Sequence, residues 1–178
     1  MIHTMVDIET LGKSKKALIW SLGAVKFDAD EIVDRFHVGI DPVDAQRYGL
    51  ELDADTVMWW MHADRDEARK LQMALPRVDL FAALDGFDMW TKATPNDERG
   101  SCWGNGATFD NVLLKSAYEA AQLEYPFSYK QDECYRTMKN RAPDVEFERI
   151  GTHHDGLADA ESQAVHLQKI CKSLGIVL

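Results

Sequence analysis

Two acidic side chains, Asp7 and Glu9, stand two positions apart in the first apolar stretch of the chain. Side chains with this spacing point to the same side of a β-strand. Exposed acids often show the spacing by coincidence, but the preceding residues Ile2, Met5 and Val6 predict a buried strand, where two acids need a reason to be. Such a pair of carboxylates can hold a hard divalent cation.

Two further acids and a histidine lie close to expected helix starts. Asp110 ends the segment WGNGATFD, which predicts a short strand, a glycine turn and the start of a helix. By itself Asp110 is better explained as an N-cap or first-turn acid that interacts with the helix dipole. His154 precedes the last helix and Asp159 lies in its first turns, at the edge of the apolar stripe, so Asp159 can face a site beside the sheet. The adjacent His153 competes with His154 for any role.

The elements that must position these residues begin with strands. Three strands are expected over residues 2–8, 17–27 and 31–40, with a tight turn at Asp28–Asp30. Helical spacing then runs from Asp53 to Leu71, capped by Asp55 or Thr56, until Pro76 interrupts it.

The second half of the chain is expected to alternate helices with strands. In order we predict a helix over 77–90, a polar loop from Thr91 to Gly100, a strand around 101–104, a helix from Asp110, a short extended piece after Pro126, and helices over 132–140 and 156–174. The last helix has an apolar stripe at 3.6-residue spacing, formed by Leu157, Ala160, Ala164, Leu167, Cys171 and Leu174.

Length and composition indicate one ordinary globular domain over residues 1–178. The chain has 46% hydrophobic and 28% charged residues, which is typical of neither disordered nor fibrous proteins. A formal charge of −10 argues against a protein that coats long nucleic acids. Neither a signal peptide nor a membrane span is expected, and the three separated cysteines indicate reduced thiols in the cytoplasm.

Taken together, the motifs carry a family resemblance. With DIET at 7–10, WGNGATFD at 103–110, and four residues between His154 and Asp159, the sequence resembles the DEDDh exonucleases of the ribonuclease H-like superfamily. The stretch DTVMWW at 55–60 narrows the resemblance to the small phage and bacterial group that includes phage T4 exonuclease A and a mycobacterial exoribonuclease. The resemblance spans essentially the whole chain.

The resemblance implies an α/β fold with a five-stranded mixed sheet, three antiparallel strands first, flanked by helices. It implies a 3′-5′ exonuclease that acts on DNA or RNA, single-stranded or with a 3′ overhang, and releases nucleoside 5′-monophosphates. Two cations, Mg²⁺ or Mn²⁺, are expected about 3.5 to 4 Å apart. A homodimer and a place in the cytoplasm of a bacterial or phage-infected cell are further expectations.

By the same resemblance, each of the five residues receives a role. Asp7 would bridge both metals, Glu9 and Asp159 would complete the site for the attacking water, and Asp110 would serve the second metal. His154 would be the general base, because imidazole titrates near neutral pH.

Contacts to the substrate are expected from residues close to these motifs. Thr10 and Leu11 follow the first motif and would meet the terminal sugar and base, while Asn105 would contact substrate or satisfy its own turn. At most one of Trp59 and Trp60 could stack on a base, since neighbouring helix positions point about 100° apart, and both could instead belong to the core. Basic residues that could steer phosphates are Lys13, Lys15, Lys16, Arg136, Lys139 and Arg141.

Two alternatives belong to other classes. A haloacid-type phosphatase needs a second Asp two residues after its nucleophile, where this chain has Glu9, and it would leave His154 without a task. A catalytically weak nucleic-acid or protein-binding module on the same fold would not need all five residues.

Overall fold

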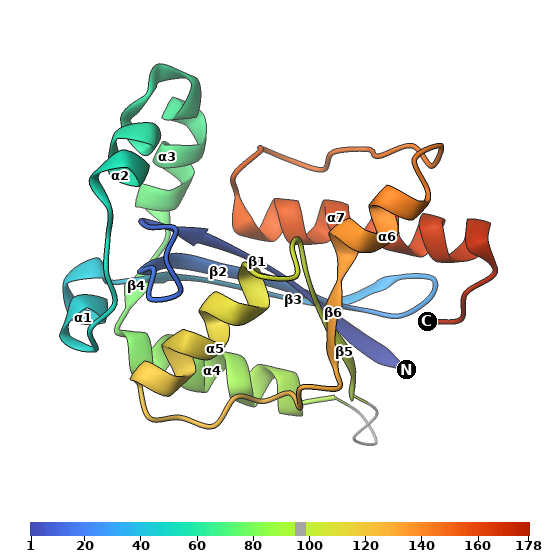
Figure 1. The fold of residues 1–178 in the computed structure, drawn as a ribbon, viewed down its shortest axis with the longest axis horizontal. Helices are drawn as coiled ribbons and strands as arrows, with labels where there is room; N and C mark the ends of the chain where they lie inside the picture. Colours follow the sequence, from blue (N-terminus) through green and yellow to red (C-terminus); the bar gives the residue numbers. More distant parts are fainter. Residues whose placement is uncertain (95–98) are drawn as a thin grey trace.

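A mixed sheet of six strands forms the centre of the computed structural model, which describes residues 1–94 and 99–178 (Figure 1). The strands are ordered β4-β3-β2-β1-β5-β6 across the sheet. Their bounds are Ile2–Thr10 for β1, Ile19–Phe27 for β2, Ile32–Ile40 for β3, Arg77–Val78 for β4, Arg99–Gly104 for β5 and Asp132–Cys134 for β6.

The first three strands form the antiparallel meander that the sequence predicted. β1 pairs with β2 and β2 with β3 in antiparallel register, and all nine residues of β2 are buried. The turn between β2 and β3 is held by the Asp28 carboxylate, which accepts the backbone N–H groups of Asp30 and Glu31. β1 continues two residues beyond the predicted 2–8, so that Glu9 lies within the strand.

The expectation of five strands was wrong, because a two-residue strand is present at the sheet edge. β4 pairs in parallel with the end of β3, where the Gly39 N–H donates to the Pro76 carbonyl. The sequence placed these residues in a helix over 77–90. That helix, α4 (Leu80–Lys92), begins only after Asp79, whose carboxylate accepts the Ala82 N–H as an N-cap.

The predicted helix from Asp53 to Leu71 is broken into pieces. α2 covers Ala54–Met61, a 3₁₀ turn covers Ala63–Arg65 and α3 covers Asp66–Ala74. Asp53, rather than Asp55 or Thr56, caps α2, because its carboxylate accepts the Thr56 N–H at 2.7 Å. The break falls at His62, whose backbone is extended. A short helix before this region, α1 (Pro42–Arg47), was not predicted.

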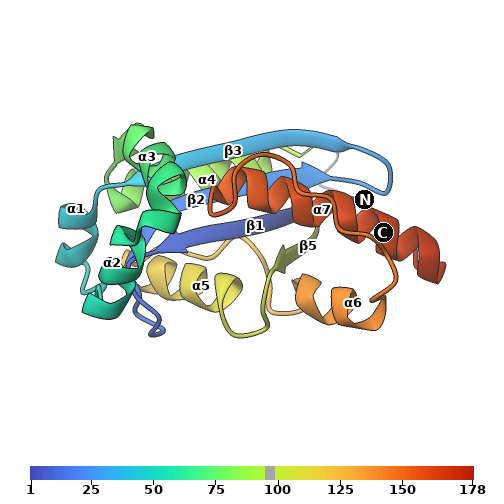
Figure 2. The ribbon, with the colours of Figure 1, turned by 90° about the horizontal axis from the view of Figure 1, so that it is seen from above.

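Helices cover both faces of the sheet (Figure 2). Residues of α4 and α5 (Asp110–Ala120) form one hydrophobic core with Val6 and Ile8 of β1. Residues of α6 (Tyr135–Arg141) and α7 (Gly156–Leu174) form a second core with Met5. The polar loop predicted over 91–100 is shorter at both ends, since α4 reaches Lys92 and β5 begins at Arg99. Residues 95–98 of this predicted loop lie outside the described residues.

The last helix, α7, has the predicted bounds and lies across β1, β2 and β3. Its stripe is buried from Ala160 to Cys171, whereas Leu174 at its end is exposed. Within the described ranges, the helices are too short or too polar to cross a membrane.

The start of α7 approaches the sheet closely enough that only glycine fits. A Cβ on Gly23 in β2 would lie 2.2 Å from the carbonyl carbon of Gly156. A Cβ on Gly156 would lie 3.0 Å from the backbone oxygen of Asp7. These two contacts fix the first turn of α7 beside the end of β1.

We therefore expect Gly23→Ala to lower the free energy of unfolding by at least about 3 kcal/mol, since backbone must move to admit the methyl group. Gly86→Ala is the matched control, because its Cβ meets nothing closer than 3.9 Å in the interior of α4. The control should stabilise by about 0.5 to 1 kcal/mol. Urea unfolding followed by circular dichroism measures both, and equal stability of the two variants would contradict the close approach.

Candidate active site

Asp7 and Glu9 lie on the side of β1 that faces α7. Their neighbours Val6 and Ile8 enter the core beneath α4 and α5, and Met5 enters the core beneath α7. The alternation of the strand therefore places both acids on the α7 side, as their spacing predicted. Glu9 is 8% exposed, so its carboxyl group is largely removed from water.

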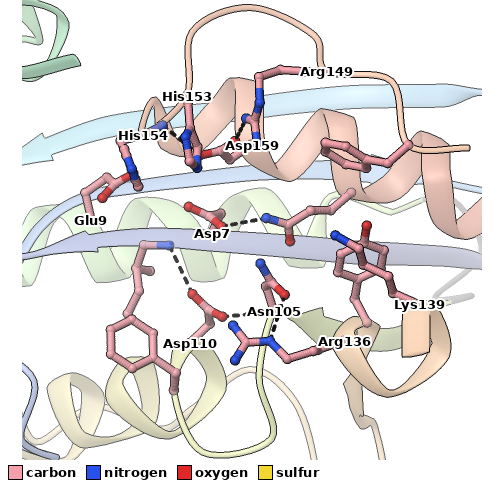
Figure 3. Close-up of a pocket in the computed structure, with 15 residues that line it drawn as sticks. Asp7, Glu9, Asn105, Asp110, Arg136, Lys139, Arg149, His153, His154 and Asp159 are labelled. Atoms are coloured by element: carbon pink, nitrogen blue, oxygen red, sulfur yellow. Dashed lines mark hydrogen bonds and ion pairs between the residues drawn. The ribbon is translucent and has the colours of Figure 1, made fainter. Parts of the chain in front are cut away.

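Asp110 reaches the same region from α5. It is the first residue of the helix, and its Oδ1 accepts the Ile8 N–H at 3.4 Å while its Oδ2 accepts the Asn105 N–H at 2.7 Å (Figure 3). Each carboxylate oxygen keeps a further lone pair, so Asp110 can still contact a ligand.

Asp159 completes the acidic group from the first turn of α7. Its Oδ2 accepts the His154 N–H at 2.8 Å, and its Oδ1 accepts from the guanidinium of Arg149. His154 has a φ of 66°, a left-handed conformation that is uncommon outside glycine. The bond from Asp159 helps to hold the His154 backbone in this conformation.

The structure brings three of the four acids into direct proximity. One ligand atom from each of Asp7, Glu9 and Asp159 lies within 4.8 Å of the others, and the same holds for His153, His154 and Asp159. All of these residues and Asp110 line one pocket with a volume of about 330 Å³ (Figure 3).

The crowding of these acids changes their protonation. Burial raises the pKa of Asp7 well above its usual range, and the charges of Asp110 and Asp159 raise it further. The pKa of Glu9 is raised by burial and then by Asp7, and burial raises the pKa of Asp110 to about 6. Without a positive partner, Asp7 and Glu9 therefore tend to hold protons near neutral pH, whereas Asp110 becomes protonated only towards pH 6.

This donor set fits a hard divalent cation. Carboxylate oxygens are the ligands that Mg²⁺ and Mn²⁺ prefer, and positive charge would remove the repulsion that raises the pKa values of these acids. In the described part of the chain, the pocket contains no cysteine that would favour a softer metal.

His154 lies at the edge of the pocket, half-buried, with its ring 3.7 Å from that of His153 and 4.9 Å from that of Trp59. Burial lowers the pKa of His154 to about 4, and the positive charges of His153 and Arg65 contribute. The imidazole is therefore neutral at pH 7 and free to accept a proton.

The residues predicted to contact substrate fall in two places. Asn105 lines the acidic pocket. A neighbouring pocket of about 450 Å³ is lined in part by Thr10, Trp59 and Trp60. Leu11 lines neither of these two pockets and is partly buried against the core.

The two tryptophans differ in exposure. Trp60 is 3% exposed and donates its Nε1–H to the Thr10 carbonyl at 2.9 Å, so it is part of the core. Trp59 is 39% exposed; its ring lies beside that of His154, and the guanidinium carbon of Arg65 lies over it, 4.5 Å from the ring centroid.

Two residues of the pocket were missed from the sequence. Gln163 donates its amide N–H to Asp7 Oδ1 at 2.7 Å, and its position one turn after Asp159 could have indicated a shared face. Arg149 binds Asp159 from an irregular loop, where no periodic signal exists. Of the predicted basic residues, Arg136 and Lys139 line the acidic pocket and Lys13 lines the neighbouring one.

The same fold occurs in solved exonuclease structures. The nuclease domain of 3′hExo, described as a DEDDh family member bound to rAMP, aligns over 99% of this chain and 94% of that one, with a TM-score of 0.68 and 14% identity. A product-bound exonuclease I aligns over 96% of this chain and 43% of that one, with a TM-score of 0.66 and 12% identity. At these identities the similarity establishes the fold alone.

The fold is therefore that of the DEDDh exonuclease structures, and the acidic pocket lies within it. No curated protein sequence matches the chain. The family model of the 3′-5′ exoribonuclease Rv2179c-like domain matches residues 2–171, and the chain belongs to this family. It is thus a 3′-5′ exonuclease.

The raised pKa values lead to a prediction about metal binding. Protons held by Asp7 and Glu9 must leave when a cation binds, and Asp110 takes up a proton only towards pH 6, so Mn²⁺ binding at pH 7 should release protons and weaken as the pH falls from 8 to 6. Calorimetric titration in two buffers of different ionisation enthalpy measures the release, and Asp7→Asn serves as the control. An affinity that does not change over this range would contradict the protonation argued here.

Proposed function

We propose that the protein hydrolyses the last phosphodiester bond at the 3′ end of single-stranded RNA or DNA, or of a 3′ overhang, and releases nucleoside 5′-monophosphates. The proposal rests above all on the acid cluster, in which Asp7, Glu9 and Asp159 lie within 4.8 Å of one another beside His154. The family is one of 3′-5′ exoribonucleases, which favours RNA as the substrate.

Four carboxylates would hold two divalent cations, Mg²⁺ or Mn²⁺. Asp7 would contact both, Glu9 and Asp159 would complete one site, and Asp110 would serve the other from the opposite side of β1. When bound, the cations would activate water, neutralise charge on the phosphate oxygens and assist the departing 3′ oxygen. Gln163 keeps Asp7 oriented, since its amide holds one of the two carboxylate oxygens.

His154 would act as the general base. A water molecule attacks phosphorus, its proton passes to the imidazole, and the bond from phosphorus to the 3′ oxygen breaks. His154 is placed for this because the contact with Asp159 fixes its backbone and a ring nitrogen lies within 4.8 Å of an Asp159 oxygen. His153, stacked on His154, is more exposed.

The terminal nucleotide would occupy the neighbouring pocket. Trp59 would stack on the base through the part of its ring that Arg65 leaves exposed, whereas Trp60 supports the Thr10 carbonyl from the core. Thr10 and Leu11 would contact the sugar and base, and Asn105 would contact the phosphate side from the acidic pocket.

A time course with 5′-labelled single-stranded RNA and DNA of the same sequence, with Mn²⁺ and resolved on a denaturing gel, tests the proposal. We expect a ladder that shortens by one nucleotide at a time, faster with RNA, and no cleavage with EDTA or with Asp7→Ala. Undiminished hydrolysis by Asp7→Ala would refute the proposed site. Bound Mn²⁺ without cleavage of either strand would favour a binding module on the same fold.

His154→Ala separates chemistry from metal binding in the same assay. The variant should bind Mn²⁺ normally but lose about 10²- to 10⁴-fold in rate, which is the usual contribution of a general base. If His154→Ala lost Mn²⁺ instead, the histidine would be a ligand rather than the base.

The adjacent tryptophans provide a matched pair. Trp59→Ala should raise KM by about tenfold or more with little change in thermal stability, because base stacking contributes about 1 to 3 kcal/mol. Trp60→Ala should instead lower the unfolding free energy by about 3 to 5 kcal/mol, since it empties part of the core. Steady-state kinetics and thermal unfolding distinguish the two, and an unchanged KM in Trp59→Ala would remove Trp59 from the substrate site.

A further inference from the structure

A positively charged side chain of this protein already binds one of the acids of the proposed metal site. The guanidinium of Arg149 donates to Oδ1 of Asp159 from the loop that joins α6 to α7 (Figure 3). The Asp159 side chain is 9% exposed and that of Arg149 is 35% exposed. Arg149 therefore reaches from the solvent side of the pocket onto a buried carboxylate.

Both carboxylate oxygens of Asp159 already accept a hydrogen bond. Oδ1 accepts from Arg149 and Oδ2 accepts from the His154 N–H. A divalent cation that uses Asp159 together with Asp7 and Glu9 must therefore approach a carboxylate that carries a guanidinium. Because two positive charges bound to the same carboxylate repel each other, the cation and Arg149 compete for Asp159.

Arg149 lies among aromatic and positively charged side chains at one side of the pocket. Its guanidinium carbon lies 5.4 Å from the ring centroid of Phe147, and Lys139 Nζ lies 5.0 Å from the same ring. Arg149, Lys139 and Arg136 line the pocket that also contains the acids. The positive side chains form its rim on the side of α6 and the 142–155 loop (Figure 3). A guanidinium at such a rim suits a phosphate, which it can bind through two parallel hydrogen bonds.

We propose that Arg149 is a phosphate-binding residue that holds Asp159 in the metal-free protein and moves to a phosphate oxygen of the substrate once a cation has taken Asp159. This inference rests on the proposed function, since the phosphate is that of the bound nucleotide. It makes binding of metal and of phosphate mutually dependent: the metal frees the arginine, and the phosphate keeps it away from Asp159.

Two calorimetric titrations test whether Arg149 exchanges Asp159 for a phosphate. They are carried out on the wild-type protein, Arg149→Gln and Arg149→Lys. Mn²⁺ alone is titrated first, and adenosine 5′-monophosphate is then titrated into the Mn²⁺-saturated protein. Arg47→Gln is the control for the loss of a positive charge, because Arg47 is 75% exposed on α1 and pairs only with Asp44 among the described residues.

Substitution of Arg149 should change the two affinities in opposite directions. Arg149→Gln should bind Mn²⁺ about three- to tenfold more tightly and the nucleotide about tenfold or more weakly than the wild type. Arg149→Lys should lie between the two, since lysine keeps the charge but not the paired hydrogen bonds. Arg47→Gln should match the wild type in both titrations. A purely structural role of Arg149 would weaken both affinities together.

Mn²⁺ affinity that is unchanged or weaker in Arg149→Gln would overturn the competition for Asp159, and an unchanged nucleotide affinity would overturn the phosphate contact. If Arg149→Gln does not fold, the same criteria apply to Arg149→Lys. Failure of the proposed function gives a different result: the wild-type protein would show these binding effects and yet cleave neither RNA nor DNA.

Discussion

Mutual repulsion of acids at the end of β1 is the constraint on which the rest of the structure depends. Asp7, Glu9, Asp110 and Asp159 converge from one strand and two helix starts, and burial raises the pKa of the first three. Such a cluster costs stability unless protons, Arg149 or bound cations offset its charge. Without a cationic ligand, the acid cluster therefore lowers the stability of the folded protein, although it is suited to binding metal. Functional sites commonly reduce stability in this way.

The fold holds this cluster together by close packing rather than by attraction between the acids. Gly23 and Gly156 let α7 lie directly on β2, which sets Asp159 beside Asp7. Asp110 is tied to β1 by the Ile8 N–H, and the N-terminal ends of α5 and α7 favour negative charge at Asp110 and Asp159. The central sheet and the two helix starts thus hold the acids close together despite their mutual repulsion.

Much of this arrangement could be predicted from local pattern. The spacing of Asp7 and Glu9 predicted that both side chains lie on one side of β1, and the apolar stripe of α7 predicted where the helix begins and ends. Both predictions follow directly from backbone periodicity. The two-residue β4 escaped prediction because it has no period of its own and depends on the edge of β3. Arg149 escaped for a similar reason: it lies in an irregular loop, and only the folded chain shows that it meets Asp159. Burial also separates the two tryptophans, which the sequence could not do: Trp60 fills the core, whereas Trp59 is 39% exposed.

Anomalous diffraction from crystals grown with Mn²⁺ tests the central claim most directly, because it locates the ions without reference to activity. The account predicts one peak in contact with Asp7, Glu9 and Asp159 and a second between Asp7 and Asp110. An Mn²⁺ peak only at His153, His154 and Asp159, or none in the acidic pocket at saturating metal, would contradict it.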